Sequence, residues 1–140
     1  MSAPLSPEVR AAIEGGHLAT LVTLNPDGSP QASVVWVGLD GDEVVTAHLG
    51  RYQKVRNIER DPRVVLTIIT GVSGEHGLDQ YLVVHGTARI TEGGAVPLLD
   101  RLAGVYLGPD QSMPLPDDPP PGVVNHITVV WVTGVGPWSG

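Results

Sequence analysis

Apolar and polar residues alternate along several short stretches of this chain, which is the pattern of β-strands with one buried face. These stretches are rich in valine, whose branched side chain packs well on a pleated surface. We predict six strands, at residues 17–24, 31–37, 43–49, 63–70, 80–90 and 123–135. The turn-rich run Asn25–Pro30 joins the first two strands as a hairpin. Gly38–Asp42 is a second turn, after which the third strand is expected to continue the meander.

A different spacing of apolar residues predicts three short helices, at residues 6–14, 51–60 and 95–107. Ser6 followed by Pro7 suits the start of the first helix. Pro62 closes the second, because the residue before a proline is pushed out of helical geometry. Residues 108–122 hold six prolines and three aspartates and are expected to form a flexible acidic loop. Gly86 interrupts the fifth strand and is expected to mark a bulge or a close backbone approach.

Six strands with short helices and hairpin connections indicate a mainly β fold, an antiparallel sheet closed or half closed into a barrel. The chain has 140 residues, the usual size of one domain, so a single domain over residues 1–140 is expected.

Composition then narrows the classes of function. The formal charge is −7 and the pI about 5.0, which disfavours a nucleic-acid binder. No apolar run is long enough to span a bilayer, and the N-terminal residues lack the pattern of a secretory signal, so a cytoplasmic protein is expected. Cysteine is absent, which excludes disulfides and thiolate chemistry.

Five of the eight cationic side chains fall within thirteen residues: Arg51, Lys54, Arg56, Arg60 and Arg63. Lys54 is the only lysine in the chain. Such a local reversal of sign in an acidic protein indicates a site for one small anion, a phosphate or a carboxylate.

A helical projection divides this basic segment. Arg51 and Lys54 share the sector of the apolar side chains and lie in the predicted first turn, next to free amides and the positive end of the helix dipole. We therefore expect them to bind phosphate. For Arg56, Arg60 and Arg63 a solvated surface with local acidic partners is the stronger interpretation: Glu59 can pair with Arg63, and Asp61 is close by.

The remaining candidates for chemistry are few. The five histidines show no metal-binding spacing, and the chain has neither a nucleophile elbow nor a dinucleotide-binding loop. His48 either lines a ligand cleft or is an ordinary hydrogen-bonded residue. Trp131 is expected to pack in the core or at a dimer contact, whereas Trp36 and Trp138 are expected to flank a flat ligand.

Four segments carry a family resemblance: Asn25–Ser33, Trp36–Glu43, Lys54–Val64 and His85–Ile90. Together they resemble the pyridoxamine 5'-phosphate oxidase-like flavin and deazaflavin oxidoreductases, and the resemblance covers about residues 5–135. The most specific element is the Lys-x-x-Asn-Ile-x-x-Asp-Pro run that begins at Lys54. The chain looks most like the actinobacterial branch that uses the deazaflavin coenzyme F420, with flavin mononucleotide (FMN) as the alternative cofactor.

The resemblance implies a split β-barrel of the FMN-binding type, a homodimer with two cofactors at the subunit interface. It places the phosphate on the basic helix, with the ring along the second and third strands. The implied cofactor-binding residues are Arg51, Lys54, Gln31, Ser33, Val35, Trp36, Thr46, Ala47, His48, Gly50, Arg56 and Arg60. Of these, Arg56 and Arg60 are assigned to the carboxylates of the F420 tail, which FMN lacks.

The implied reaction is hydride transfer from reduced deazaflavin to an activated double bond of a small organic substrate. No catalytic residue is assigned; His48 or Tyr81 is a hypothetical proton donor. The last strand carries no arginine, so the vitamin oxidase activity of some relatives is not expected. A non-catalytic flavin or haem-binding module, and a structural domain without ligand, remain as alternatives.

Overall fold

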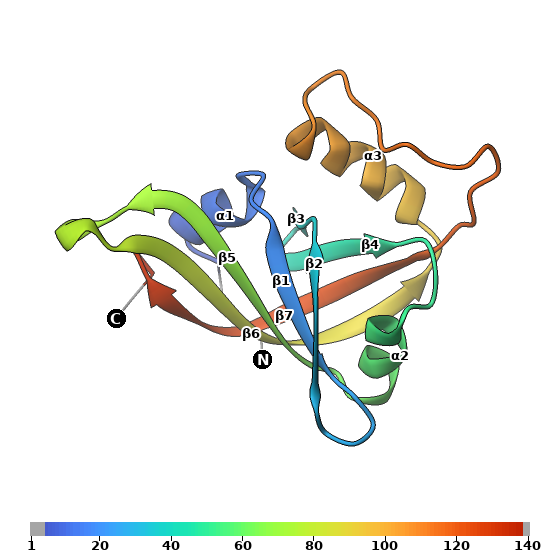
Figure 1. Cartoon of the computed structure of the whole chain (residues 1–140), viewed down its shortest axis with the longest axis horizontal. Coiled ribbons are helices and arrows are strands. Elements are labelled where there is room, and N and C mark those ends of the chain that lie inside the picture. The colour runs from blue at the N-terminus through green and yellow to red at the C-terminus, as the bar shows by residue number, and fades with distance from the viewer. Residues whose placement is uncertain (1–4, 139–140) are drawn as a thin grey trace.

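The computed structural model describes residues 5–138 (Figure 1). Its elements, in chain order, are α1 (Pro7–Glu14), β1 (Ala19–Leu24), β2 (Pro30–Val35), β3 (Gly38–Asp40), β4 (Glu43–His48), α2 (Gln53–Arg60), β5 (Arg63–Ser73), the short 3-10 helix η1 (Glu75–Gly77), β6 (Asp79–Glu92), α3 (Ala95–Tyr106) and β7 (Val123–Val135). The predicted mainly β composition with short helices is confirmed.

The strands form one antiparallel sheet in the order β2-β1-β5-β6-β7-β4-β3. β2 and β3 lie at opposite ends of this order, yet only Trp36 and Val37 separate them in the chain. The sheet must therefore curl until its two ends approach each other, which gives a split barrel (Figure 1).

This order corrects the predicted meander. The strand β4 pairs with β3 and β7, not with β2. Residues 38–42, predicted as a turn, contain the strand β3, and the turn itself is only Gly41 and Asp42. Gly41 has φ 61°, the left-handed conformation that so tight a hairpin needs.

Inward-facing residues of the barrel make the main core, including the fully buried Leu21, Leu66, Leu82 and Ile127. The helix α1 adds Ile13 to the same core, and the Ser6 hydroxyl caps this helix by accepting the Val9 N–H at 3.2 Å. The predicted start of α1 is confirmed.

The helix α2 begins at Gln53, two residues later than predicted. Tyr52 is its N-cap, in an extended conformation, so Arg51 lies outside the helix and not in its first turn. The helix ends at Arg60, before Asp61 and Pro62, as predicted. It contacts β1 and β6.

The helix α3 packs outside the barrel on a small apolar cluster of its own: Val45, Leu98, Leu102 and Val124. It belongs to an excursion between β6 and β7 whose ends are tied together. The Gly93 N–H donates to the Gly122 carbonyl at 2.7 Å, and the Ala95 N–H to the Pro121 carbonyl at 3.2 Å. Residues 108–122 contain no helix or strand.

Two details concern β5 and β6. The pairing register shifts between His85 and Gly86, which confirms the predicted irregularity, and a Cβ on Gly86 would lie 2.4 Å from the Thr128 carbonyl oxygen. The hairpin is also longer than predicted: β5 runs to Ser73 and β6 starts at Asp79, because their ladder continues across the predicted loop (Figure 1).

Candidate functional site

A pocket of about 250 Å³ lies where β2, β4, α2 and α3 meet. Its lining is mostly apolar, with Lys54 and His48 as the two ionisable groups. The lining residues are Leu18, Val34, Val35, Trp36, Ala47, His48, Lys54, Leu99, Leu102 and Met113. Five predicted site residues thus meet in one cavity, from segments that are far apart in the chain.

Lys54 is a cation with spare hydrogen-bonding capacity. Its Nζ donates to the Ser33 hydroxyl at 3.1 Å and lies 5.7 Å from the centre of the Tyr52 ring. Among the side chains that the structure describes, no carboxylate pairs with it. Burial lowers the pKa of Lys54, since desolvation disfavours the ammonium form. An ammonium group has three donors, so two remain for an anion.

The start of α2 adds donors beside Lys54. The Val55 and Arg56 N–H groups both reach the Tyr52 carbonyl, whereas the amides of Gln53 and Lys54 precede the first intrahelical bond. No acidic residue lies in this first turn, and no side chain caps it. Amides, helix dipole and ammonium together form an arrangement that suits a phosphate.

His48 forms another part of the pocket wall. It is 5% exposed, and its Nε2 lies 2.8 Å from the Thr46 hydroxyl. Burial, and secondarily the charge of Lys54, lower the pKa of His48 to about 4. The imidazole is therefore neutral at neutral pH and offers hydrogen bonding, not a charged acid.

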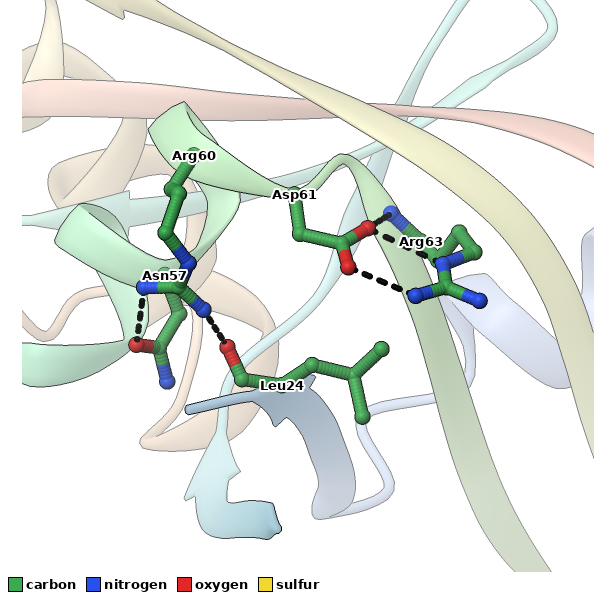
Figure 2. A network of polar contacts seen from close by, with 5 residues as sticks. All are labelled: Leu24, Asn57, Arg60, Asp61 and Arg63. Atoms are coloured by element: carbon green, nitrogen blue, oxygen red, sulfur yellow. Dashed lines mark hydrogen bonds and ion pairs between the residues drawn. The ribbon is translucent and has the colours of Figure 1, made fainter. Parts of the chain in front are cut away.

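A polar network attaches α2 to the β1–β2 hairpin and so fixes Lys54. The Asn57 side-chain amide, with 0% exposure, donates to the Thr23 hydroxyl at 3.0 Å and to the side-chain Oδ1 of Asn25 at 2.9 Å. Figure 2 shows the part of this network at the end of the helix, where Arg60 donates to Asn57 and to the Leu24 carbonyl.

The other cations of the basic segment have partners within the protein. Arg51 pairs with Glu59 and with Glu92. Arg63 has a local acidic partner, as predicted. The partner is Asp61 and not Glu59, because Asp61 lies just across Pro62 and its two oxygens reach the Arg63 side chain at 3.0 and 2.7 Å (Figure 2).

Arg56 donates to the Arg51 carbonyl and to the Gln53 side chain, each at 2.8 Å. Arg56 and Arg60 thus donate to neutral acceptors, and neither forms an ion pair with a carboxylate among the described side chains. The charge of Arg60 nevertheless acts on Asp61, whose pKa is lowered first by the hydrogen bonds from Arg63 and to a smaller extent by Arg60.

Other predicted site residues lie beside the pocket. Ser33 reaches it through Lys54, and Thr46 lies behind His48. Gln31 turns to the Thr23 hydroxyl, 3.1 Å away, and Gly50 lines a separate depression with Arg51.

Sequence reasoning missed five lining residues: Leu18, Val34, Leu99, Leu102 and Met113. The helical spacing of Leu99 and Leu102 was a usable signal for an apolar face. Met113 stands in the proline-rich segment, where no periodicity marks it.

The three tryptophans lie in different surroundings. Trp36 lines the pocket and stacks on Tyr106, with 5.1 Å between ring centres. Trp138 donates to the Tyr81 carbonyl at 2.9 Å and does not line the pocket, so its predicted place beside Trp36 is wrong. Trp131 is 52% exposed and stacks on His85, outside the core.

The chain matches the family model described as pyridoxamine 5'-phosphate oxidase over residues 5–136, and it belongs to this family. The fold is thus the flavin-binding split barrel of a family that includes oxidoreductases. Among curated proteins, none matches the chain.

Solved structures give more specific similarities. An F420 reductase is 26% identical, with a TM-score of 0.73, and the match covers 89% of this chain and 94% of the reductase. The conserved hypothetical protein Rv2991 from Mycobacterium tuberculosis is 21% identical, with a TM-score of 0.72 and coverage of 99% and 86%, and shows the fold alone. A heme binding protein from Mycobacterium smegmatis is 27% identical, with a TM-score of 0.64, over 91% of this chain and 52% of that protein.

Two further features concern the helices and the potential metal ligands of the described residues. None of their helices has the length and apolar character needed to cross a membrane. No group of three or more potential metal ligands occurs among them.

Proposed function

We propose that this protein is an F420-dependent reductase, which uses the reduced deazaflavin to reduce an activated double bond of a small organic substrate. The observation that carries the proposal is Lys54, a partly desolvated ammonium without a carboxylate partner in residues 5–138, in a largely apolar pocket at the start of a helix. Such a cation fits the phosphate that F420 and FMN share.

The bound cofactor supplies the hydride chemistry. The protein's part is to bind and orient. Lys54 and the first amides of α2 hold the phosphate, and Ser33 fixes the Lys54 ammonium. Trp36, Leu99 and Met113 exclude water from the ring side of the pocket.

Two observations favour F420 over FMN as the cofactor. One structural neighbour is an F420 reductase, at 26% identity. In addition, Arg56 has no carboxylate partner among the described side chains and Arg60 forms no ion pair with one, and F420 brings tail carboxylates beyond its phosphate. Their role in binding the tail stays a prediction, as does a phosphate contact by Arg51.

We further propose that the active form is a homodimer. The outward face of β1, β2, β5, β6 and β7 carries no carboxylate, lysine or arginine at thirteen positions that the pairing registers place side by side. We call this surface the uncharged face; it consists of Thr20, Val22, Ala32, Val34, Val65, Thr67, Ile69, Tyr81, Val83, His85, Trp131, Thr133 and Val135.

The exposed lining of the pocket supports the proposal that a second copy of the chain covers the uncharged face. Val34 belongs to the uncharged face and also lines the pocket, where it is 62% exposed, as is Leu18. At about 250 Å³ the cavity is smaller than typical ligand sites, which measure roughly 300–1,000 Å³. A partner subunit would complete its open wall.

The absence of cysteine agrees with the reducing cytoplasm, which we propose as the location.

The test is a titration of purified protein with F420 and with FMN, in which binding is measured by the fluorescence of the cofactor. We expect tighter binding of F420, and we expect Lys54→Met to weaken it about 10- to 100-fold, the effect of losing a hydrogen bond to a charged group. Arg63→Met is the matched control, since Arg63 is paired with Asp61 on the surface. Equal binding by wild type and Lys54→Met would refute the assigned site.

A haem-binding module is the second candidate, favoured by the 27% identity to a heme binding protein. It predicts a Soret band after addition of haem and no change in F420 fluorescence. An absorption spectrum of the titrated protein separates the two functions.

A further inference from the structure

Tyr106 lies at the end of α3 and does not itself line the pocket. It contacts three residues in or next to the pocket wall: Trp36, His17 and Val37. Its ring stacks on Trp36 at an angle of 10° between the ring planes. Its hydroxyl donates to the His17 carbonyl at 2.7 Å and accepts the Val37 N–H at 3.0 Å. His17 and Val37 lie two positions beyond Ala19 and Val35, the last pair of the β1–β2 ladder, so the phenol bridges these two chain segments where their own strand pairing has ended.

Both segments lead directly into the pocket. His17 precedes Leu18, and Val37 follows Trp36, and the pocket is lined by Leu18 and Trp36. Val37 also stands where the chain passes from β2 to β3, between the two ends of the sheet. Its N–H is satisfied by a side chain there, because strand pairing stops at Val35 and resumes at Gly38.

The chemistry of the contact favours a fixed geometry. Tyr106 is half-buried, and burial raises the pKa of its hydroxyl, so the group stays protonated and keeps its donor. A stacked aromatic pair limits rotation of the indole, and the two hydrogen bonds fix the phenol that carries the stack. Tyr106 therefore holds the Trp36 indole on one side, while the other side of the indole faces the cavity.

We propose that Tyr106 is a positioning residue that orients Trp36 and the Leu18 segment as the wall of the pocket against which the flat ring of the ligand lies. The identity of that ring rests on the function proposed above. Tyr106 is expected to affect the ring and not the phosphate, because Tyr106 contacts Trp36 and the phosphate is assigned to Lys54.

A test without any ligand uses Trp36 as the reporter. In a Trp131→Phe, Trp138→Phe background, excitation at a wavelength that tyrosine does not absorb gives tryptophan fluorescence from Trp36 alone. We expect Tyr106→Phe to make Trp36 more accessible to acrylamide and to lower its fluorescence anisotropy, with an unchanged far-UV circular dichroism spectrum. Arg101→Leu is the control, because it removes a different contact of α3, to the Leu39 carbonyl. Identical quenching of Trp36 before and after the Tyr106→Phe substitution would overturn the proposal.

A test with ligand uses the deazaflavin chromophore with its ribityl chain but without the phosphate. We expect Tyr106→Phe to weaken its binding about 3- to 10-fold, the usual effect of lost hydrogen bonds. In a Trp36→Leu background the same substitution should have little further effect, since Tyr106 acts through Trp36. Additive losses would contradict the proposal.

These measurements also separate the two proposals. If wild type binds no deazaflavin and no FMN, the proposed function fails, while the acrylamide experiment still decides the role of Tyr106. If Lys54→Met alone weakens the phosphate-bearing cofactor and Tyr106→Phe changes neither quenching nor chromophore binding, the function stands and the role of Tyr106 is refuted.

Discussion

His48 carries a pH dependence that follows from its surroundings. Its pKa is about 4 in the folded protein, against an ordinary value of 6.5. The unfolded chain therefore takes up a proton first as the pH falls. The contribution of His48 to stability is complete above pH 6.5 and is lost progressively between pH 6.5 and pH 4.

We predict that wild type loses about 2 kcal/mol of unfolding free energy through this residue between pH 7 and pH 5. His48→Gln should remove that part of the loss, because glutamine does not titrate. Urea unfolding at the two pH values measures it. His76→Asn is the control, since His76 lies in the β5–β6 connection, away from the pocket. A pH dependence unchanged by His48→Gln would show that His48 takes up its proton equally in the folded and unfolded states, which would contradict the lowered pKa.

At the residue scale, the basic segment also shows that a count of charges does not reveal the environment of each cation. Arg51 and Lys54 were equivalent candidates on a helical projection. The structure separates them, because Arg51 precedes the helix and meets two glutamates, whereas Lys54 enters an apolar pocket. Glu92 belongs to β6, far from Arg51 in the chain, so no local sequence pattern predicts the ion pair between Arg51 and Glu92.

At the element scale the long strands β6 and β7 depend on one glycine. The Cβ of any other residue at position 86 would lie 2.4 Å from the Thr128 carbonyl oxygen, and that neighbour is backbone of β7. The backbone cannot yield without breaking the ladder between these strands.

We predict that Gly86→Ala lowers the unfolding free energy by about 3 kcal/mol, as expected of overpacking against backbone. Gly104→Ala in α3 is the control: nothing lies within 4 Å of its added Cβ, and alanine favours helix. It should be neutral or stabilise by roughly 0.5–1 kcal/mol. Equal unfolding midpoints for the two variants in urea would contradict the close approach.

The helix α3 and the segment that follows it are more weakly specified. Their apolar spacing predicted the helix correctly, but the contact surface is a small cluster outside the barrel. That Leu99, Leu102 and Met113 face a pocket shared with β2 and β4 depends on how the excursion folds back.

At the scale of the whole molecule, the uncharged face is the strongest argument for a dimer. We predict that Val83→Glu converts the protein to a monomer, since a carboxylate at the centre of a dimer contact is buried without a partner. Light scattering after gel filtration measures the mass. The same variant should bind F420 less tightly, because the proposed pocket is completed by the second copy.

Val105→Glu is the matched control, an exposed valine on α3 outside the uncharged face. It should leave both mass and affinity unchanged. A wild-type protein that is monomeric at all concentrations would refute the dimer.

The sequence by itself determined the features that depend on neighbouring residues. Six of the seven strands follow from alternation, whereas β3 lies in residues predicted as a turn. The start of α1 follows from Ser6 and Pro7, the end of α2 from Pro62, and the irregularity in β6 from Gly86. The family and its barrel also followed, because the run from Lys54 to Pro62 is specific. Local sterics and local hydrogen bonds are sufficient for such inferences.

The tertiary structure alone decided the order of the strands, the partners of the cations and the walls of the pocket. Placing β4 beside β7 depends on pairing between residues about eighty positions apart, and any antiparallel strand with an apolar face would satisfy the same local pattern. Lys54 shows the difference most clearly. Its presence was readable in the chain, but its desolvation arises only when β2, β4 and α3 close around it.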